Sequence, residues 1–452
     1  MAIQGSIPSE LTVGAKGGPE ARLSGHLDLS RVRIRQWLRI LLGVGSAQAA
    51  VHAMGFVAGI WIIRCLAPGQ YALYTMTYAV QGMLNVLTDG GISSGAMAEG
   101  GKVWKDPRRL GQVVNTALSM RRTLTCVGLA IGVPLGLFLF HRQGASWVFA
   151  SGLLGVVLFS FWLNFGASIF ALAPALHQKL AETQKISLVQ NAGRVGVLLT
   201  ILRWIPNALA AVAVNAVGQF WAFIRIRHLA EGLIDRTAQE CPEVRRRIWE
   251  VVRKILPGSV YFCLSGQIGI LVISLFGSTI KVAQVGALSR LGQAFAAVAL
   301  LASTIIVPRF ARLPSSRPLL LARYVQVMAG LVVIALVSIA VAAVFPAQVL
   351  WLLGGQYSNL APELLLMTAG SALSLLAQFT YCLGCSRGHV VPPVLGITLE
   401  VSVQAILLAL VDLHEVRGVL LMGLLMAAFQ CLLQSTNLVV RIRRHELTPA
   451  PA

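Results

Sequence analysis

The chain has 452 residues, of which 56% are hydrophobic and only 12% are charged, with a mean hydropathy of +0.75. Soluble domains carry roughly 25% charged residues, so this composition excludes an ordinary soluble protein, including a large one with long core helices. The formal net charge is +20. Because the basic residues lie between apolar stretches, without interleaved aromatic residues, the charge indicates membrane topology and not nucleic-acid binding.

The N-terminal residues 1–35, rich in Gly, Ser and Pro, predict a disordered cytoplasmic tail. The first apolar run begins near Leu38, too late for a secretory signal peptide. Twelve segments that follow are long enough to cross a hydrocarbon layer of about 30 Å as helices. We expect these spans at residues 40–63, 71–93, 118–140, 147–170, 187–204, 207–225, 255–277, 283–307, 324–345, 360–382, 391–411 and 418–440.

Prolines mark many of the expected span ends, because proline lacks an amide donor and disfavours helix in the residue before it. These boundary positions are Pro68-Gly69, Pro206, Pro257-Gly258, Pro308, Pro346 and Pro392-Pro393. Pro134 and Pro174 fall inside spans or at their ends, where we expect kinks.

The distribution of basic residues predicts the orientation in the membrane. With the N-terminus in the cytoplasm, 30 of the 37 Lys and Arg residues lie in cytoplasmic segments, and only five lie on the opposite side. Cytoplasmic loops of membrane proteins carry such an excess of positive charge. We therefore expect both termini in the cytoplasm.

A long polar connection divides the spans into two sets of six. The expected parts are a half at 36–226, a basic cytoplasmic linker at 227–254, a half at 255–440 and a tail at 441–452. Weak similarity between the halves, such as Gly45-Ser46 and Gly258-Ser259, favours a parallel repeat, and transporters built this way bind substrate between their halves. The fold class predicted is all-α, with about twelve transmembrane helices in two six-helix halves around a central cavity.

Few ionisable side chains fall inside the predicted spans, where each is costly unless it faces protein, water or a partner. The candidates are His52, Arg194, Arg290 and Glu400, with Asp89, Arg121 and Arg122 at the cytoplasmic mouth. Arginines in both halves and scarce acidic residues predict a cationic cavity. A planar guanidinium binds phosphate oxygens bidentately, so Arg194 and Arg290, with His52, are candidates for binding a phosphate or pyrophosphate.

Each candidate also has a structural explanation. Arg194 and Arg290 are alternatively placed by snorkelling or by bonds to carbonyl groups, and His52 by packing. Asp89 fits a helix cap or an ion pair. Glu400, at the middle of its span, is a candidate for coupling to H⁺ or Na⁺, and the alternative is a static pair or hydrogen bond.

Two sequence motifs of enzymes are absent from the chain: it has no HExxH and no Walker A sequence. The seven cysteines are scattered, and Cys382 and Cys385 have no second pair with which to form a metal site. We expect a transporter that hydrolyses no ATP and holds no cofactor or metal.

Three segments carry a family resemblance. Ile63–Tyr74 resembles the "R-x-L-x-P-x-[EQ]-[YF]-G-x-Y" signature of bacterial polysaccharide flippases, with Ala72 where the family usually has Gly. Leu87–Ile92 is similar to the family's "L-x-D-x-G-[IL]", and Val285–Leu291 to its "V-G-x-[YL]-S-x-A-x-R-L" region, shorter by one residue. These are the Wzx-like proteins of the multidrug/oligosaccharidyl-lipid/polysaccharide exporter superfamily.

The resemblance covers roughly residues 35–440 and implies a flippase for lipopolysaccharide, O-antigen or other surface polysaccharide biosynthesis. The protein would lie in the bacterial inner membrane and turn an undecaprenyl-pyrophosphate-linked oligosaccharide from the cytoplasmic to the external leaflet by alternating access. Expected partners are that lipid, membrane lipids, a polysaccharide polymerase and glycosyltransferases. An ion-coupled multidrug or metabolite antiporter and a non-transport scaffold of an envelope-synthesis complex are the alternatives. The glycan, the coupling ion and the oligomeric state stay open.

Overall fold

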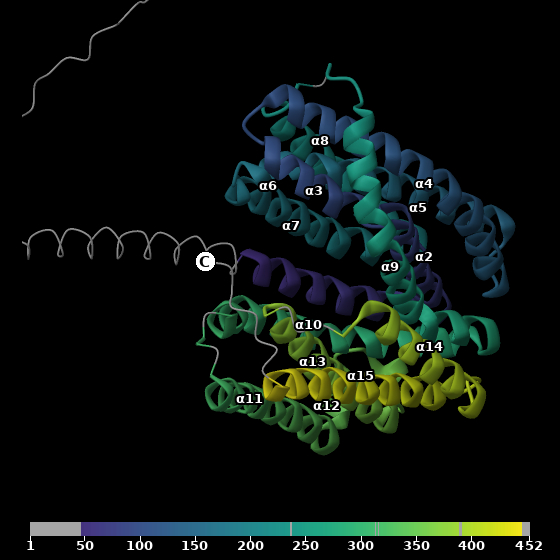
Figure 1. Cartoon of the computed structure of the whole chain (residues 1–452). Coiled ribbons are helices and arrows are strands. Elements are labelled where there is room, and N and C mark those ends of the chain that lie inside the picture. Colours follow the sequence, from purple (N-terminus) through teal and green to yellow (C-terminus); the bar gives the residue numbers. More distant parts are fainter. Residues whose placement is uncertain (1–46, 236, 312, 315, 388–390, 445–452) are drawn as a thin grey trace, which may run out of the picture. The chain divides into compact units, whose positions relative to one another are not determined.

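The computed structural model describes residues 47–444 apart from 236, 312, 315 and 388–390. The tail expected at 1–35 and residues 445–452 of the expected C-terminal tail lie outside the described residues. Every regular element within the described part of the chain is helical (Figure 1). The predicted all-α fold is confirmed.

The helices follow one another with short connections. Those of the first half are the first helix (Ala47–Cys65), α2 (Pro68–Asp89), α3 (Ile92–Val103), α4 (Pro107–Arg142), α5 (Trp147–Phe170), α6 (Leu172–Leu176), α7 (Leu180–Trp204) and α8 (Ala208–Glu231). Those of the second half are α9 (Pro242–Phe276), α10 (Thr279–Ala311), α11 (Arg317–Val344), α12 (Pro346–Trp351), the 3₁₀ turn η1 (Gly355–Tyr357), α13 (Ala361–Cys385), α14 (Pro393–Leu410) and α15 (Val416–Arg444).

Each predicted span lies mainly on one of these helices, and residues 40–46 of the first span lie outside the described residues. Eight of the described helices are long and apolar enough to cross a membrane. The other four predicted spans lie on α2, α7, α10 and α14, helices of 22, 25, 33 and 18 residues. In the most apolar 18-residue stretch of α11, only 17% of the residues are buried. Its exposed side chains therefore suit contact with lipid. The chain is a multi-pass membrane protein.

Several helices begin well before the apolar span that they carry. The helix α4 begins at Pro107, where the Asp106 side chain accepts hydrogen bonds from the amides of Arg108 and Arg109 and so caps the helix. The helix α9 begins at Pro242, so most of the basic segment expected as a linker at 227–254 is helical. Hydropathy measures the length in contact with lipid, and the polar first turns of these helices lie beyond it.

Prolines end fewer helices than the sequence predicts. Pro257 was expected at a helix end and lies inside α9, and Pro308 lies inside α10, so both predicted boundaries are wrong. Pro134 lies inside α4. Pro174 lies in the short α6, directly after α5 ends at Phe170. Proline is tolerated inside membrane helices because neighbouring groups satisfy the freed carbonyl.

Most helices pack against others of their own half. In the first half α2 packs on α4, and α8 packs on both α5 and α7. In the second half α13 lies between α10 and α15 (Figure 1). The halves meet where α2 packs on α10 and where α9 packs on α2, α3 and α4. At Gly286 of α10 an added Cβ would lie 2.5 Å from the hydroxyl oxygen of Thr75, so this close approach to α2 requires glycine.

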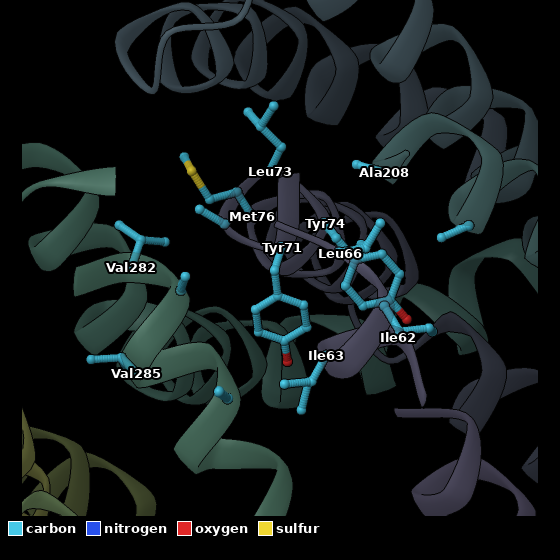
Figure 2. Close-up of a cluster of buried hydrophobic side chains, with 14 of the residues drawn as sticks. Ile62, Ile63, Leu66, Tyr71, Leu73, Tyr74, Met76, Ala208, Val282 and Val285 are labelled. Carbon is cyan, nitrogen blue, oxygen red and sulfur yellow. The ribbon is translucent and has the colours of Figure 1, made fainter. Parts of the chain in front are cut away.

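A buried apolar cluster joins the first helix, α2, α8 and α10 (Figure 2). Ile63 and the ring of Tyr71 lie at its centre, with Val282 and Val285 contributed by α10. The Tyr71 hydroxyl, which would be costly to bury unpaired, donates a hydrogen bond to the carbonyl oxygen of Gly286 at 3.2 Å. The cluster therefore lies at the contact between the halves, where α2 packs on α10.

Candidate functional site

Arg290 lies on α10 against the aromatic face of α2. Its guanidinium carbon is 5.7 Å from the ring centroid of Tyr74 and 5.8 Å from that of Tyr78, within the range of cation–π attraction. Its Nη1 donates a long hydrogen bond of 3.5 Å to the side chain of Gln293. A Cβ on Gly59 of the first helix would lie 3.5 Å from the Arg290 Cδ.

Arg194 reaches the same region from α7. Its Nη1 donates a hydrogen bond of 3.4 Å to the side-chain oxygen of the buried Asn215 on α8. Its Nη2 lies 3.9 Å from the position that a Cβ on Gly55 would occupy. The Arg194 Nε is buried and has no hydrogen-bond partner among the residues that the structure describes.

The first helix brings the two arginines together. Gly55 and Gly59 lie one helical turn apart on one face, about 6 Å along the axis. The ring face of Tyr78 contacts the Arg290 guanidinium. The structure therefore gathers Arg194 of the first half and Arg290 of the second half around Gly55, Gly59 and Tyr78, a group that we call the arginine site.

His52 lies on the same face of the first helix, one turn before Gly55. Its side chain is exposed, and its Nε2 is 3.5 Å from the side-chain nitrogen of Gln48. No described contact joins His52 to either arginine. The predicted third member of the phosphate-binding set thus lies beside the arginine site, toward the N-terminal end of the helix.

The arginine site lacks an anion of its own. Among the described residues, no carboxylate lies within 4.0 Å of Arg194 or Arg290. A guanidinium offers five N–H donors. Arg194 donates a long bond to the amide oxygen of Asn215, and Arg290 donates one to that of Gln293 and also hydrogen-bonds to the Tyr71 side chain, so the partners are neutral. A partly buried cation is stabilised by a paired anion, so the site is suited to a ligand with acidic oxygens.

The residues predicted at the cytoplasmic mouth divide into two kinds. Arg121 is almost fully buried, forms an ion pair of 3.6 Å with Asp89, and donates to the carbonyl of Phe165 and the hydroxyl of Ser168. Its neighbour Arg122 is exposed. Asp89 ends α2 and also accepts a hydrogen bond from Ser93. Arg121 and Asp89 therefore hold helices together, and Arg122 is placed at the surface.

Glu400 lies in a second polar group, within the second half. Its side chain is 3% exposed and accepts a hydrogen bond of 3.3 Å from Gln430 on α15. Tyr261 on α9 also hydrogen-bonds to it. On the next turn of α14, Gln404 donates to the Ser265 hydroxyl at 3.4 Å. These residues form a group, the Glu400 site, which joins α9, α14 and α15.

The Glu400 site holds an acid among neutral partners. Within the described part of the chain, no Lys or Arg lies within 4.0 Å of Glu400. Of the two structural alternatives for Glu400, the static pair with an arginine is not formed there, whereas the hydrogen bond is formed, with Gln430. A buried carboxyl of this kind is stabilised by a proton or by a bound cation. No described contact joins the Glu400 site to the arginine site, so they are separate.

Two hollows found in the structure lie outside these sites. A hollow of about 360 Å³ is lined by Lys102–Asp106 and Arg109, and a small apolar one lies between α2 and α4. Neither includes Arg194 or Arg290. Among the described residues, no group of three or more His, Cys, Asp or Glu residues is placed to hold a metal ion.

The site contains residues that the sequence analysis did not single out. Tyr74 and Tyr78 share one face of α2, and Gly55 and Gly59 recur at the spacing of one helical turn. Both spacings are visible in the sequence. Asn215 carries no such signal, because it contacts Arg194 only after α7 and α8 have packed together.

Solved structures of transporters match this chain over most of its length. An inward-facing multidrug resistance MATE family transporter of the MOP superfamily matches with a TM-score of 0.68 at 14% identity, covering 88% of this chain and 96% of that one. An outward-facing MATE family transporter matches with a TM-score of 0.53 at 16% identity, covering 91% and 96%. The chain has the MATE transporter fold.

A MOP superfamily transporter from Pyrococcus furiosus also shares this fold, with a TM-score of 0.56 at 13% identity, covering 90% of this chain and 96% of that one. For that protein a reverse polarity of the binding pocket suggests a different function. No protein-family model matches the chain, and no curated protein sequence matches it. The likeness is therefore one of fold.

Proposed function

We propose that the chain is a flippase that exports an undecaprenyl-pyrophosphate-linked oligosaccharide across the bacterial inner membrane, with both termini in the cytoplasm. The observation that carries this proposal is the arginine site. Two guanidinium groups, one from each half, meet around the first helix without a carboxylate partner among the described residues. A pyrophosphate supplies the acidic oxygens that they lack.

The geometry suits an anionic headgroup. The missing side chains at Gly55 and Gly59 let the two guanidinium groups approach the backbone of the first helix. Tyr74 and Tyr78 contact Arg290 through their ring faces and therefore use none of its N–H donors, so those that do not bond to Tyr71 or Gln293 can bind a ligand oxygen. Because the site lies in a span of low dielectric, each charge interaction is stronger than in water.

Transport requires the two arginines to bind the headgroup in one state and release it in another. They belong to different halves, so a movement of one half against the other changes their separation and breaks the bidentate geometry. The oligosaccharide would cross in the aqueous space between the halves while the polyprenyl tail stays in lipid. Glu400 would couple this cycle to H⁺ or Na⁺, because its buried carboxyl has neutral partners.

An ion-coupled multidrug antiporter is the second candidate, and the comparisons favour it. The matched structures include multidrug resistance MATE family transporters, and one of them has the highest TM-score given above. The Pyrococcus furiosus structure indicates that pocket polarity varies among proteins of this fold. A site for cationic drugs would favour acidic residues, whereas Arg194 and Arg290 favour an anion.

Ligand binding to the purified protein separates the two functions. We expect undecaprenyl pyrophosphate to bind in detergent, with loss of affinity in Arg194→Ala and Arg290→Ala, and a cationic dye such as ethidium to bind weakly in the same assay. Tight dye binding that the arginine substitutions leave unchanged or strengthen would support the antiporter. Absence of lipid binding by the wild-type protein would refute the flippase.

A further inference from the structure

Arg64, at the end of the first helix, caps a helix of the other half. Its Nε donates to the carbonyl oxygen of Leu352 at 2.9 Å, and its Nη2 donates to that of Trp351 at 2.6 Å. Its guanidinium carbon also lies 4.4 Å from the centroid of the Trp351 ring. These carbonyls lie at the C-terminal end of α12, where helix carbonyls lack intrahelical partners and the dipole favours a cation.

Gln356 makes the reverse connection. Its side-chain nitrogen donates to the carbonyl oxygen of Ile63 at 3.0 Å and to that of Leu66 at 3.4 Å. Both carbonyls lie at the C-terminal end of the first helix, which ends at Cys65. Each half therefore supplies one side chain that satisfies the orphan carbonyls of a helix in the other half.

We propose that this reciprocal clasp, formed by Arg64 and Gln356 with the helix ends that they cap, holds the outer side of the carrier closed. The inference rests on the proposed function, since a transporter must open and close this side. In the predicted orientation, both the end of the first helix and the segment Trp351–Gln356 lie on the external side. The occupied clasp corresponds to a state that is open toward the cytoplasm.

Other contacts on the same side agree with the closed state. Gln143, between α4 and α5, donates to the carbonyl of Ser274 on α9 at 2.9 Å, and Arg142 donates to the carbonyl of Leu275. The apolar cluster of Figure 2 lies beneath the clasp, since it contains Ile63 and Leu66. The clasp thus lies on the outer edge of an apolar seal.

The comparison with solved transporters gives an independent indication. The chain matches the inward-facing structure with a TM-score of 0.68 and the outward-facing one with 0.53. The arrangement of its helices thus resembles the inward-facing state more closely.

The clasp is built to be reversible. Arg64 is exposed, so water can replace its two carbonyl acceptors when the halves separate. The carbonyls on both helix ends can likewise be hydrated after opening. The bonds therefore bias the equilibrium between two states without locking one of them.

Distance measurements between the halves test the clasp without a transport assay. Spin labels at Val148→Cys, at the start of α5, and Val344→Cys, at the end of α11, would report the separation of the outer ends in lipid nanodiscs. The native cysteines are replaced in this background. We expect Arg64→Ala with Gln356→Ala to raise the ratio of the longer to the shorter distance by roughly tenfold, because charge-assisted hydrogen bonds are lost.

Two further variants keep the result decisive. Arg203→Ala removes an exposed outer-side arginine and should leave the distances unchanged. Gln356→Glu keeps the size of the side chain and loses both donated bonds, so it should also shift the distances if the double variant does not fold. A distribution identical to that of the wild type in the folded variants overturns the clasp. A shift in a protein that binds no lipid pyrophosphate would support the clasp and refute only the flippase.

Discussion

Arg290 on α10 lies over the ring of Tyr78 on α2, with 5.8 Å between the guanidinium carbon and the ring centroid. Arg194 on α7 approaches Gly55, one turn before the Gly59 that Arg290 approaches, so one face of the first helix adjoins cations that belong to different halves. Two neighbouring cations repel each other, and the π-electrons of the ring offset only part of that repulsion. An anion bound between the two cations would remove this repulsion.

Removing either cation should weaken the binding of a pyrophosphate lipid. We expect Arg194→Ala and Arg290→Ala each to lower affinity roughly 10- to 100-fold, the usual effect of losing a charge-assisted hydrogen bond. Titration of the purified protein with undecaprenyl pyrophosphate measures this. Arg203→Ala, a matched loss of charge at an exposed position of α7, should bind as the wild type does. Equal affinity in all four proteins would contradict an anion site.

The size of residue 59 should control the site without a change in charge. A Cβ at Gly59 would lie 3.5 Å from Arg290 Cδ, an ordinary contact, so Gly59→Ala should bind nearly normally. Gly59→Leu should displace the guanidinium and lower affinity at least as much as Arg290→Ala does. The same titration tests the series, and normal binding by Gly59→Leu would show that Arg290 does not meet the ligand at this face.

Glu400 should be required for coupling to an ion gradient. Glu400→Gln keeps the hydrogen-bonding shape but cannot ionise, so we expect slower transport that no longer responds to an imposed H⁺ or Na⁺ gradient. Flipping of a fluorescent lipid-linked oligosaccharide in proteoliposomes is the measurement. Glu182→Gln, an exposed site on α7, is the control. A normal gradient response in Glu400→Gln would assign the residue to structure.

The two adjacent arginines of α4 should differ in their contribution to stability. Asp89→Asn leaves Arg121 buried without its ion-pair partner and should lower the free energy of unfolding by about 2–3 kcal/mol. Arg122→Ala, at an exposed position, should have little effect. Thermal unfolding in detergent compares them. If Asp89→Asn unfolds at the wild-type temperature, the ion pair does not hold α2 and α4 together.

Glu99 should make stability depend on pH. Burial opposes ionisation of this carboxyl, but hydrogen bonds from Lys102 at 2.5 Å and Arg247 at 3.3 Å outweigh it and lower the pKa of Glu99. Because the folded-state pKa is lowered, the stabilisation is fully present above the ordinary glutamate value of about 4.3 and is lost as the pH falls through the folded-state value.

The test of that dependence compares melting temperatures of the wild type and Glu99→Gln across pH. The difference should be largest near neutral pH and should shrink as the wild-type carboxyl becomes protonated. A difference that stays constant down to the acid limit would show that packing, and not charge, stabilises α3 against α9.

Hydropathy predicted the fold because lipid imposes one solution on a spanning segment, a helix with all its backbone bonds satisfied internally. It did not predict that α4 and α9 continue into water, because their polar turns are stabilised by caps and by packing. At α9, Ile248 packs so closely on Gly95 that an added Cβ would lie 3.0 Å from its Cγ2. Such contacts depend on which helices become neighbours, and one sequence does not specify that.

The site was predictable in its residues and not in its geometry. Arg194 and Arg290 are conspicuous because charge is rare in spans, but their meeting at Gly55 and Gly59 depends on the rotation of three helices. Helix geometry also explains why Arg121 and Arg122, neighbours on α4, have different surroundings. Adjacent residues point about 100° apart on a helix, so one is buried and the other exposed.

The connection between the halves, residues 232–241, is bound to α4 at several of its described positions. The Asp235 amide donates to the carbonyl of Pro107 at 2.9 Å, the side chain of Asn115 donates to the carbonyl of Ala238 at 2.7 Å, and Gly111 makes room for the backbone of Asp235. A connector bound in this way cannot act as a joint. We therefore expect the halves to pivot further along the chain, within α9. There Pro257 lacks the amide hydrogen for one backbone hydrogen bond, so the helix can bend at this residue.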